Sequence, residues 1–154
     1  MRTPPVGTVG DRYRSSRLRT TDLLSVLGTD EWATPVPTCP GWSVHDVLSH
    51  LVGVAEDALS GRITGPPPPE VTAEEVARHA GDDPVELLAA WGELAPSLEA
   101  ALSQFRLWPG FFDALAHEHD ARGALGTPGA RDPADVALAA ELLVRDLALP
   151  VALE

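Results

Sequence analysis

The sequence predicts an all-α fold, in which four main helices form a bundle and one long proline-rich segment crosses between them. Apolar residues recur at spacings of three and four through long stretches, and residues that typically begin helices precede those stretches. No segment before Leu149 alternates apolar and polar residues over any length, as a half-buried strand would. The 154 residues are enough for one compact domain with a core.

The N-terminal part is expected to be a short arm followed by the first helix. Residues 1–11 are rich in proline and glycine and should form a loose arm, while residues 12–149 should form the bundle domain. The first helix is predicted from Asp11 or Arg12 to Leu27, with Leu18 on its buried side. Its arginines are interpreted as a helix face that compensates the negative charge of the rest of the chain, rather than as a nucleic-acid site.

A packed loop and a second helix come next. Three prolines within residues 31–42 should exclude a helix there, whereas two tryptophans and Cys39 indicate a loop packed on the core. Ser43 is a good N-cap, with Asp46 three residues later, and predicts a helix to about Ser60.

Four consecutive prolines within residues 61–71 predict an extended crossover. Thr72 and Glu75 have the spacing of a capping box and predict a short helix that ends near Gly81. A longer helix is predicted over residues 83–105, because Asp-Pro followed by Glu86 has the order of an N-cap, a first turn and an acidic third position.

The C-terminal third is predicted to contain a turn at residues 107–110 and helices over residues 111–126 and 132–149. The first of these helices concentrates charged residues and histidines. Asp113 and His117 share one face of it, at a spacing of four. Glu118 and Arg122 are the natural candidates for the solvent-exposed face of this helix, so Asp113 and His117 are expected to point away from that face.

The composition limits the classes of partner and compartment. The net charge of −12 should repel nucleic-acid phosphates and anionic membranes, so neither is expected as a partner, and a monomer or homodimer is expected. The single cysteine rules out an internal disulfide and fits a reducing compartment such as the cytoplasm. No apolar run approaches the length of a bilayer span.

Two motifs stand out together: Cys-Pro-Gly-Trp-Ser-Val-His-Asp-Val-Leu-Ser-His-Leu-Val-Gly over residues 39–53, and Asp-Ala-Leu-Ala-His over residues 113–117, followed by an aspartate and Ala-Leu-Gly. The combination resembles the mycothiol-dependent maleylpyruvate isomerase family of the DinB-like superfamily, over about residues 23–149. The resemblance implies an up-down-down-up four-helix bundle. Family members often continue into a smaller part with β-strands, so residues 150–154 are expected to begin a missing C-terminal part.

The resemblance also implies one divalent metal, held by His50, Asp113 and His117. An acid and a histidine one helical turn apart can reach one cation, and a third ligand from a facing helix leaves room for water or substrate. Considered alone, His50 is a border residue whose ring edge would reach water. The acidic ligand of the family is more often glutamate, whose side chain is one methylene longer than that of Asp113. His119 or Asp120 could replace Asp113 as the ligand. The residues expected to support the ligands or to line the rim are Asp46, Asp57 and Asp120.

The expected function is that of a cytoplasmic enzyme, an isomerase or thiol S-transferase. Its metal would present mycothiol, or another low-molecular-weight thiol, as a thiolate to an electrophilic small molecule. Zinc is the expected metal, and nickel, iron and manganese are the alternatives. Two other classes stay open: a non-catalytic metal-binding or regulatory module, and an interaction protein that dimerises through residues 136–149. Cys39 is an alternative catalytic thiol, although a packed loop explains it better.

Overall fold

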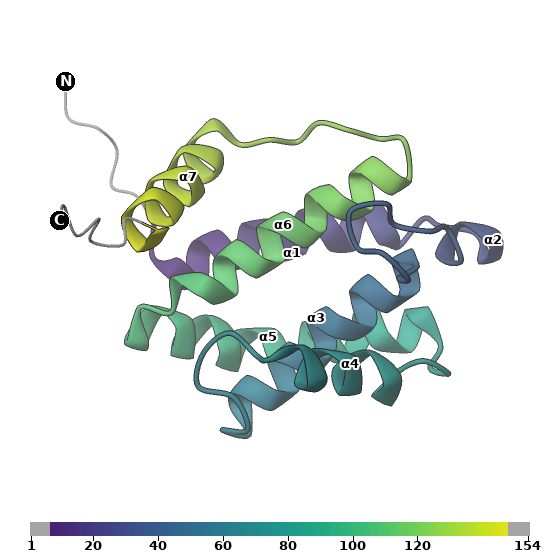
Figure 1. Ribbon diagram of the computed structural model, residues 1–154, viewed down its shortest axis with the longest axis horizontal. Coiled ribbons are helices and arrows are strands. Elements are labelled where there is room, and N and C mark those ends of the chain that lie inside the picture. The colour runs from purple at the N-terminus through teal and green to yellow at the C-terminus, as the bar shows by residue number, and fades with distance from the viewer. Residues whose placement is uncertain (1–6, 148–154) are drawn as a thin grey trace, which may run out of the picture.

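The computed structural model describes residues 7–147, and these form seven helices and no strand (Figure 1). The helices are α1 (Val9–Leu24), α2 (Thr29–Trp32), α3 (Val44–Leu59), α4 (Pro69–Arg78), α5 (Pro84–Phe105), α6 (Trp108–Ala124) and α7 (Pro133–Leu147). The all-α prediction is confirmed for this part of the chain. Within it, no helix combines the length and the apolar character needed to cross a membrane.

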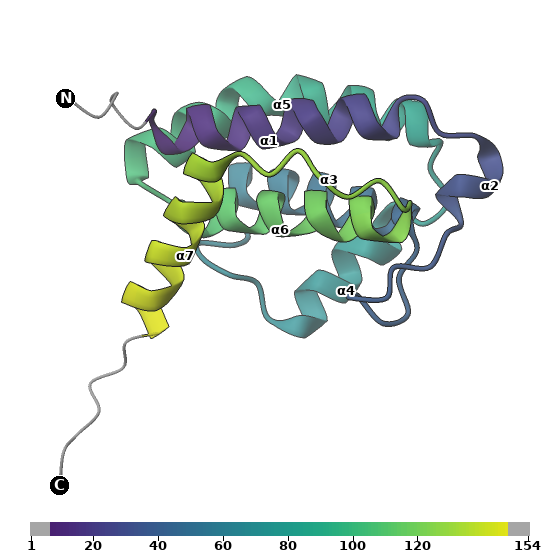
Figure 2. The ribbon, with the colours of Figure 1, turned by 90° about the horizontal axis from the view of Figure 1, so that it is seen from above.

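Four helices pack around one shared core. α1 contacts both α5 and α6, and α3 also contacts both α5 and α6, so the four helices close a ring. The view from above shows α1 beside α5, with α4 lying along α3 (Figure 2). α7 lies near the start of α1 (Figures 1 and 2).

The core fills the inside of this ring. Trp91 of α5, Phe111 of α6 and Leu48 of α3 are all fully buried. The indole N–H of Trp91 donates to Tyr13 Oη at 2.8 Å, which gives both polar groups a partner inside the core. This packing holds α3 and α6 face to face.

α1 begins and ends earlier than predicted. Thr8 caps the helix, because its Oγ1 accepts the backbone N–H of Asp11, whose carboxylate accepts the N–H of Thr8 in return. Residues 9–11 of the predicted arm are therefore helical, and the helix ends at Leu24 rather than Leu27. Leu18 is 44% exposed, so its predicted burial is wrong. The buried polar side chains of this helix are Tyr13, Ser16 and Thr20.

The caps of α3 and α5 are those predicted. Ser43 and Asp46 form a capping box at the start of α3, and Asp83 accepts the backbone N–H groups of Val85 and Glu86 at the start of α5. The loop before α3 packs on the core through its tryptophans, as expected. Its first residues are helical, however, since α2 extends to Trp32, ahead of the first proline of the loop.

Two helices have a proline in their first turn, where an extended chain or a turn was predicted. α4 starts at Pro69 rather than Thr72, and α6 starts at Trp108, with Pro109 in its first turn. The Thr72 capping box is therefore not formed, and Glu75 lies fully buried in the interior of α4. The helix boundaries predicted at these two places are wrong.

Arg12, Arg17 and Arg19 of α1 pair with acids on other helices, as interpreted from the sequence. Arg12 lies 2.8 Å from Asp135, and Arg19 lies 2.9 Å from Glu118. Glu118 is fully buried, so its assignment to a solvent-exposed face is wrong, although it does pair with Arg122 at 3.2 Å. α7 begins one residue after the predicted Asp132, and the end predicted at Leu149 lies outside the described residues, as does the strand predicted over residues 150–154.

Candidate metal centre

The three residues expected to bind metal converge between α3 and α6. His50 comes from the second turn of α3, and Asp113 and His117 lie one turn apart on α6. One ligand atom from each of the three lies within 4.8 Å of the others. Metal binding by this group stays a prediction, but its geometry can be tested against what a cation needs.

His50 is buried and has a carboxylate at each ring nitrogen. Nδ1 lies 3.0 Å from Glu75 Oε2, and Nε2 lies 3.3 Å from Asp113 Oδ2. His50 is 3% exposed, so it does not reach water as a border residue would, and that expectation is wrong. Because a carboxylate only accepts, both ring nitrogens donate when His50 is protonated. In the neutral ring that can bind metal, the proton stays on Nδ1, which is nearer to its carboxylate, and Nε2 keeps its lone pair.

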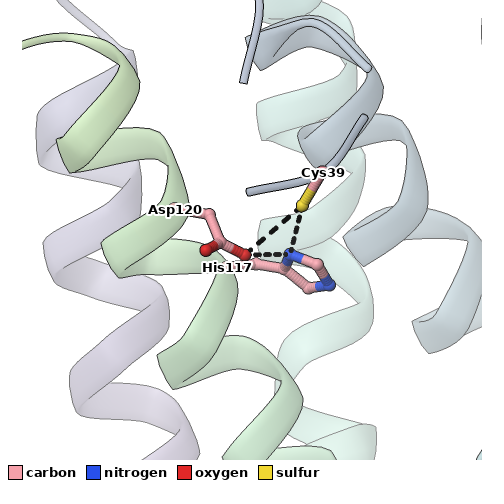
Figure 3. A group of neighbouring side chains, drawn as sticks. All are labelled: Cys39, His117 and Asp120. Atoms are coloured by element: carbon pink, nitrogen blue, oxygen red, sulfur yellow. Dashed lines mark hydrogen bonds and ion pairs between the residues drawn. The ribbon is translucent and has the colours of Figure 1, made fainter. Parts of the chain in front are cut away.

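His117 repeats this arrangement. Nδ1 lies 3.0 Å from Asp120 Oδ2, and Nε2 lies 3.4 Å from Asp113 Oδ1. Figure 3 shows Asp120 and Cys39 together on the Nδ1 side of the ring. Asp120 also accepts hydrogen bonds from the hydroxyl of Thr38 at 2.7 Å and the thiol of Cys39 at 3.4 Å.

The two imidazoles therefore point the same nitrogen at the same carboxylate. Each Nδ1–H is held by an outer acid, Glu75 or Asp120, which leaves each Nε2 free to face Asp113. Carboxylates placed in this way behind metal-ligating histidines hold the ring orientation and raise the basicity of the ligating nitrogen. The donor set is thus two imidazole nitrogens and one carboxylate.

Trp42 packs against both rings. Its ring centroid lies 5.3 Å from that of His50 and 5.9 Å from that of His117, whose own centroids are 4.9 Å apart. Trp42 comes from the packed loop before α3. The loop therefore restricts the rotation of both imidazoles.

The carboxylates around these rings shift their protonation. Burial alone lowers the pKa of His50, but hydrogen bonds and negative charge from Asp113 and Glu75 outweigh it and raise this pKa to about 9. Burial raises the pKa of Asp113, but hydrogen bonds from His117 and His50 lower it by more. The pKa of Asp113 therefore lies below its usual range. Without metal, the positive charge of protonated His50 compensates part of the negative charge that a metal cation would compensate.

Negative charge exceeds positive charge in this cluster. Glu75, Asp113 and Asp120 surround the two imidazoles, which are their ion-pair partners within the described residues. Glu75 is fully buried, and its Oε1 has no hydrogen-bond partner there. Burying a carboxylate is costly unless positive charge compensates it, so a divalent cation fits this donor set.

A second group on the other side of His117 also has metal-ligand chemistry. Cys39, His117 and Asp120 each offer an atom within 4.8 Å of the others. The thiol already donates to Asp120, and burial and the charge of that acid raise the pKa of Cys39 to about 11. Without metal, Cys39 is therefore protonated at neutral pH, which disfavours it as a nucleophile.

The other candidate residues lie apart from the convergence point. Asp46 caps α3, and Asp57 is buried in ion pairs with Arg62 and Arg78, where it ties the crossover and α4 to α3. His119 belongs to neither ligand group of the described residues. Of the three acids expected around the ligands, Asp120 contacts one of them, whereas the contacts of Asp46 and Asp57 are with other residues.

Sequence reasoning missed Glu75 and Trp42 as parts of this site. Glu75 was assigned to a helix cap, and its bond to His50 spans 25 residues between separate helices. Trp42 was expected only to pack the loop. The one sequence signal for it is its position within the first motif, eight residues before His50.

Comparison with family models found a match over most of the chain. The model of the mycothiol maleylpyruvate isomerase N-terminal domain matches residues 13–149. Comparison with curated proteins and with solved structures found no match. The matched residues include every side chain of the candidate centre.

Proposed function

The chain belongs to the mycothiol maleylpyruvate isomerase N-terminal domain family, and from this premise we propose that it is a metal-dependent enzyme that uses a low-molecular-weight thiol. The reaction is an isomerisation or a thiol transfer on an electrophilic small molecule, and the thiol is mycothiol. In this proposal the ring of α1, α3, α5 and α6 is an up-down-down-up bundle of the DinB-like type. The protein works in the cytoplasm, as a monomer or homodimer.

One observation carries this proposal. The Nε2 atoms of His50 and His117 face a single carboxylate, that of Asp113, while outer acids hold both Nδ1–H groups. Three protein ligands with a free side are typical of catalytic rather than structural metal sites. Zinc suits two imidazoles and a carboxylate, and nickel, iron and manganese accept the same donors.

A divalent cation at these three residues would lower the pKa of a bound thiol and so supply a thiolate nucleophile. The residues of the chain perform the remaining tasks. Glu75 and Asp120 keep the protons on the Nδ1 atoms, so both Nε2 lone pairs stay directed at the centre. Trp42 limits ring rotation, and Asp113, whose side chain is 33% exposed, forms the open side.

The proposal is tested by metal content and by the response to thiol. His50→Ala and His117→Ala should each lose stoichiometric metal in elemental analysis of protein purified without added metal. His119→Ala, the same change two residues from His117, should retain it, because His119 is outside the ligand group. Unchanged metal content in both ligand variants would show that the site is assigned wrongly.

Addition of mycothiol should then raise the melting temperature of the metal-loaded protein and leave that of His117→Ala unchanged. Binding only to the folded state stabilises it by mass action. A protein that holds metal but shows no response to thiols would instead be the non-catalytic metal-binding module.

A further inference from the structure

A cavity of about 310 Å³ adjoins the proposed metal centre at Asp113. It lies between α3, α5, the start of α6 and the proline-rich crossover, whose residues 63–67 form one of its walls. Its volume is at the lower end of the range for small-molecule sites. We call it the crossover cavity.

The lining of the crossover cavity is almost entirely apolar. Of its 18 lining residues, Asp113 is the one that carries a charge, and the other polar side chains are the hydroxyls of Tyr13 and Thr64. Phe105 and Leu107 line it and are 63% and 37% exposed, so apolar side chains also meet the solvent there. Exposed apolar side chains beside a cavity are typical of a ligand-binding site.

Asp113, the one charged residue of the lining, already has a role as a proposed metal ligand. In the proposed function, on which this step rests, the carboxylate of Asp113 binds metal and is not available to a second charged group. No arginine or histidine lines the cavity to compensate an anion. Away from the metal centre at Asp113, a ligand charge of either sign would therefore be desolvated without a partner, which costs far more than the burial of neutral apolar atoms gains.

From this geometry we infer that the crossover cavity binds the body of an uncharged, largely apolar substrate and places it beside the metal centre. The substrate class is thus a neutral apolar electrophile rather than a carboxylate or another anion. Tyr13 supplies a polar group in the wall. Its Oη accepts from Trp91, which leaves its own proton available for a hydrogen-bond acceptor such as a carbonyl oxygen.

Two fluorescent probes with the same aromatic rings test this inference. N-phenylnaphthylamine is neutral, and anilinonaphthalene sulfonate carries one added anionic group. The metal-loaded protein should bind the neutral probe at least about tenfold more tightly than the sulfonated one. Equal affinity, or tighter binding of the sulfonated probe, would overturn the inference.

A pair of matched variants places the probe. Ala101 of α5 lines the cavity, whereas Ala89 of the same helix is exposed and outside it. Ala101→Trp should weaken binding of the neutral probe at least about tenfold, and Ala89→Trp should leave it unchanged. Ala58→Leu, a smaller filling from α3, replaces Ala101→Trp if that variant fails to fold. Neutral-probe binding that both cavity fillings leave intact would contradict the inference.

A third variant adds the missing charge. Thr64 lies on the crossover wall and is exposed, so Thr64→Arg introduces a cation without disturbing a packed residue. It should raise the affinity for the sulfonated probe about tenfold and leave the neutral probe close to wild type. If Thr64→Arg does not raise the affinity for the sulfonated probe, the selectivity of the cavity does not come from its lack of positively charged residues.

Metal content separates this inference from the proposed function. Ala101→Trp should keep its metal, since the substitution is outside the three ligands. If His50→Ala retains metal while the wild-type protein still discriminates between the probes, the metal assignment fails and the neutral cavity stands. If metal is lost as expected but the probes bind equally, only the inference about the substrate fails.

Discussion

His50 has opposite demands on its two ring nitrogens. Nδ1 must stay protonated to donate to the buried carboxylate of Glu75, whereas Nε2 must be unprotonated to bind metal. In the metal-free protein both nitrogens face carboxylates, and a second proton on the ring satisfies them. Metal and proton therefore compete for the same nitrogen.

This competition predicts a pH dependence for the metal-free protein. The pKa of His50 is raised from 6.5 to about 9, so the proton stabilises the folded state. The contribution is complete below pH 6.5 and is lost as the pH rises to about 9. Urea denaturation should show a decline in the free energy of unfolding across this window, of at most about 3 kcal/mol.

The metal-loaded protein and metal-free His50→Ala are the controls for that measurement. Neither carries the stabilising proton, so neither should show the decline. The same slope in His50→Ala would mean that a different group titrates.

The local part of the site was predictable, and its distant supports were not. Asp113 and His117 share a face because their spacing is a property of any straight helix. The partnership of His50 with Glu75 depends on how α4 lies on α3, and periodicity says nothing about that. His50, predicted to lie at the edge of the apolar face, and Glu75, predicted to cap a helix, are instead a buried pair.

The approach of α4 to α3 depends on one glycine. A Cβ atom added at Gly53 would lie 2.6 Å from Cβ of Glu75 and 3.1 Å from its Cα. These distances are too short for any side chain at this position, so only glycine lets the two helices come this close. The absent side chain is what brings Glu75 within hydrogen-bond distance of His50.

Gly53→Ala should therefore separate α4 from α3 and weaken the site. We expect a loss of about 1–3 kcal/mol in the free energy of unfolding, together with a lower affinity for zinc measured by calorimetry. Gly92→Ala in α5 is the matched control, because nothing lies within 4 Å of the added atom. It should stabilise the protein by about 0.5–1 kcal/mol, since alanine favours a helix over glycine. If both variants behave alike, the close approach does not matter.

The starts of α3 and α5 were predicted correctly from their capping residues, whereas those of α4 and α6, which have a proline in the first turn and no side-chain cap, were not. Ser43 and Asp83 bind N–H groups of their own helices, and such local bonds can be predicted from a few residues. Pro69 and Pro109 were interpreted as parts of an extended segment and a turn. A proline is equally at home in the first turn of a helix, where its missing N–H costs nothing.

Over the whole molecule, a buried ionic network joins three helices. Glu118 of α6 accepts hydrogen bonds from Ser16 at 2.8 Å and from Arg19 at 2.9 Å, both on α1. Arg19 also reaches Asp135 of α7 at 3.2 Å. Arg19 and Glu118 are 99 residues apart in the chain, so a helical wheel could only assign Glu118 to a polar face and not to the interior.

Removal of the carboxylate at the centre of this network should destabilise the entire fold. Glu118→Ala leaves Arg122 without the carboxylate it pairs with, Arg19 with Asp135 alone, and Ser16 without its acceptor. Breaking a fully buried pair costs about 3–5 kcal/mol; because both arginines are partly exposed and Arg19 keeps Asp135, we expect a loss of about 2–3 kcal/mol. The loss should appear as a lower midpoint in urea denaturation.

Glu74→Ala is the matched control, since Glu74 pairs with Arg62 at the surface and its side chain is 61% exposed. Exposed pairs contribute at most about 1 kcal/mol, so this variant should unfold close to the wild type. Equal effects of the two substitutions would show that the Glu118 network is screened by water. A large difference would mean that α6, which also carries Asp113 and His117, is held against α1 by charge as well as by apolar packing.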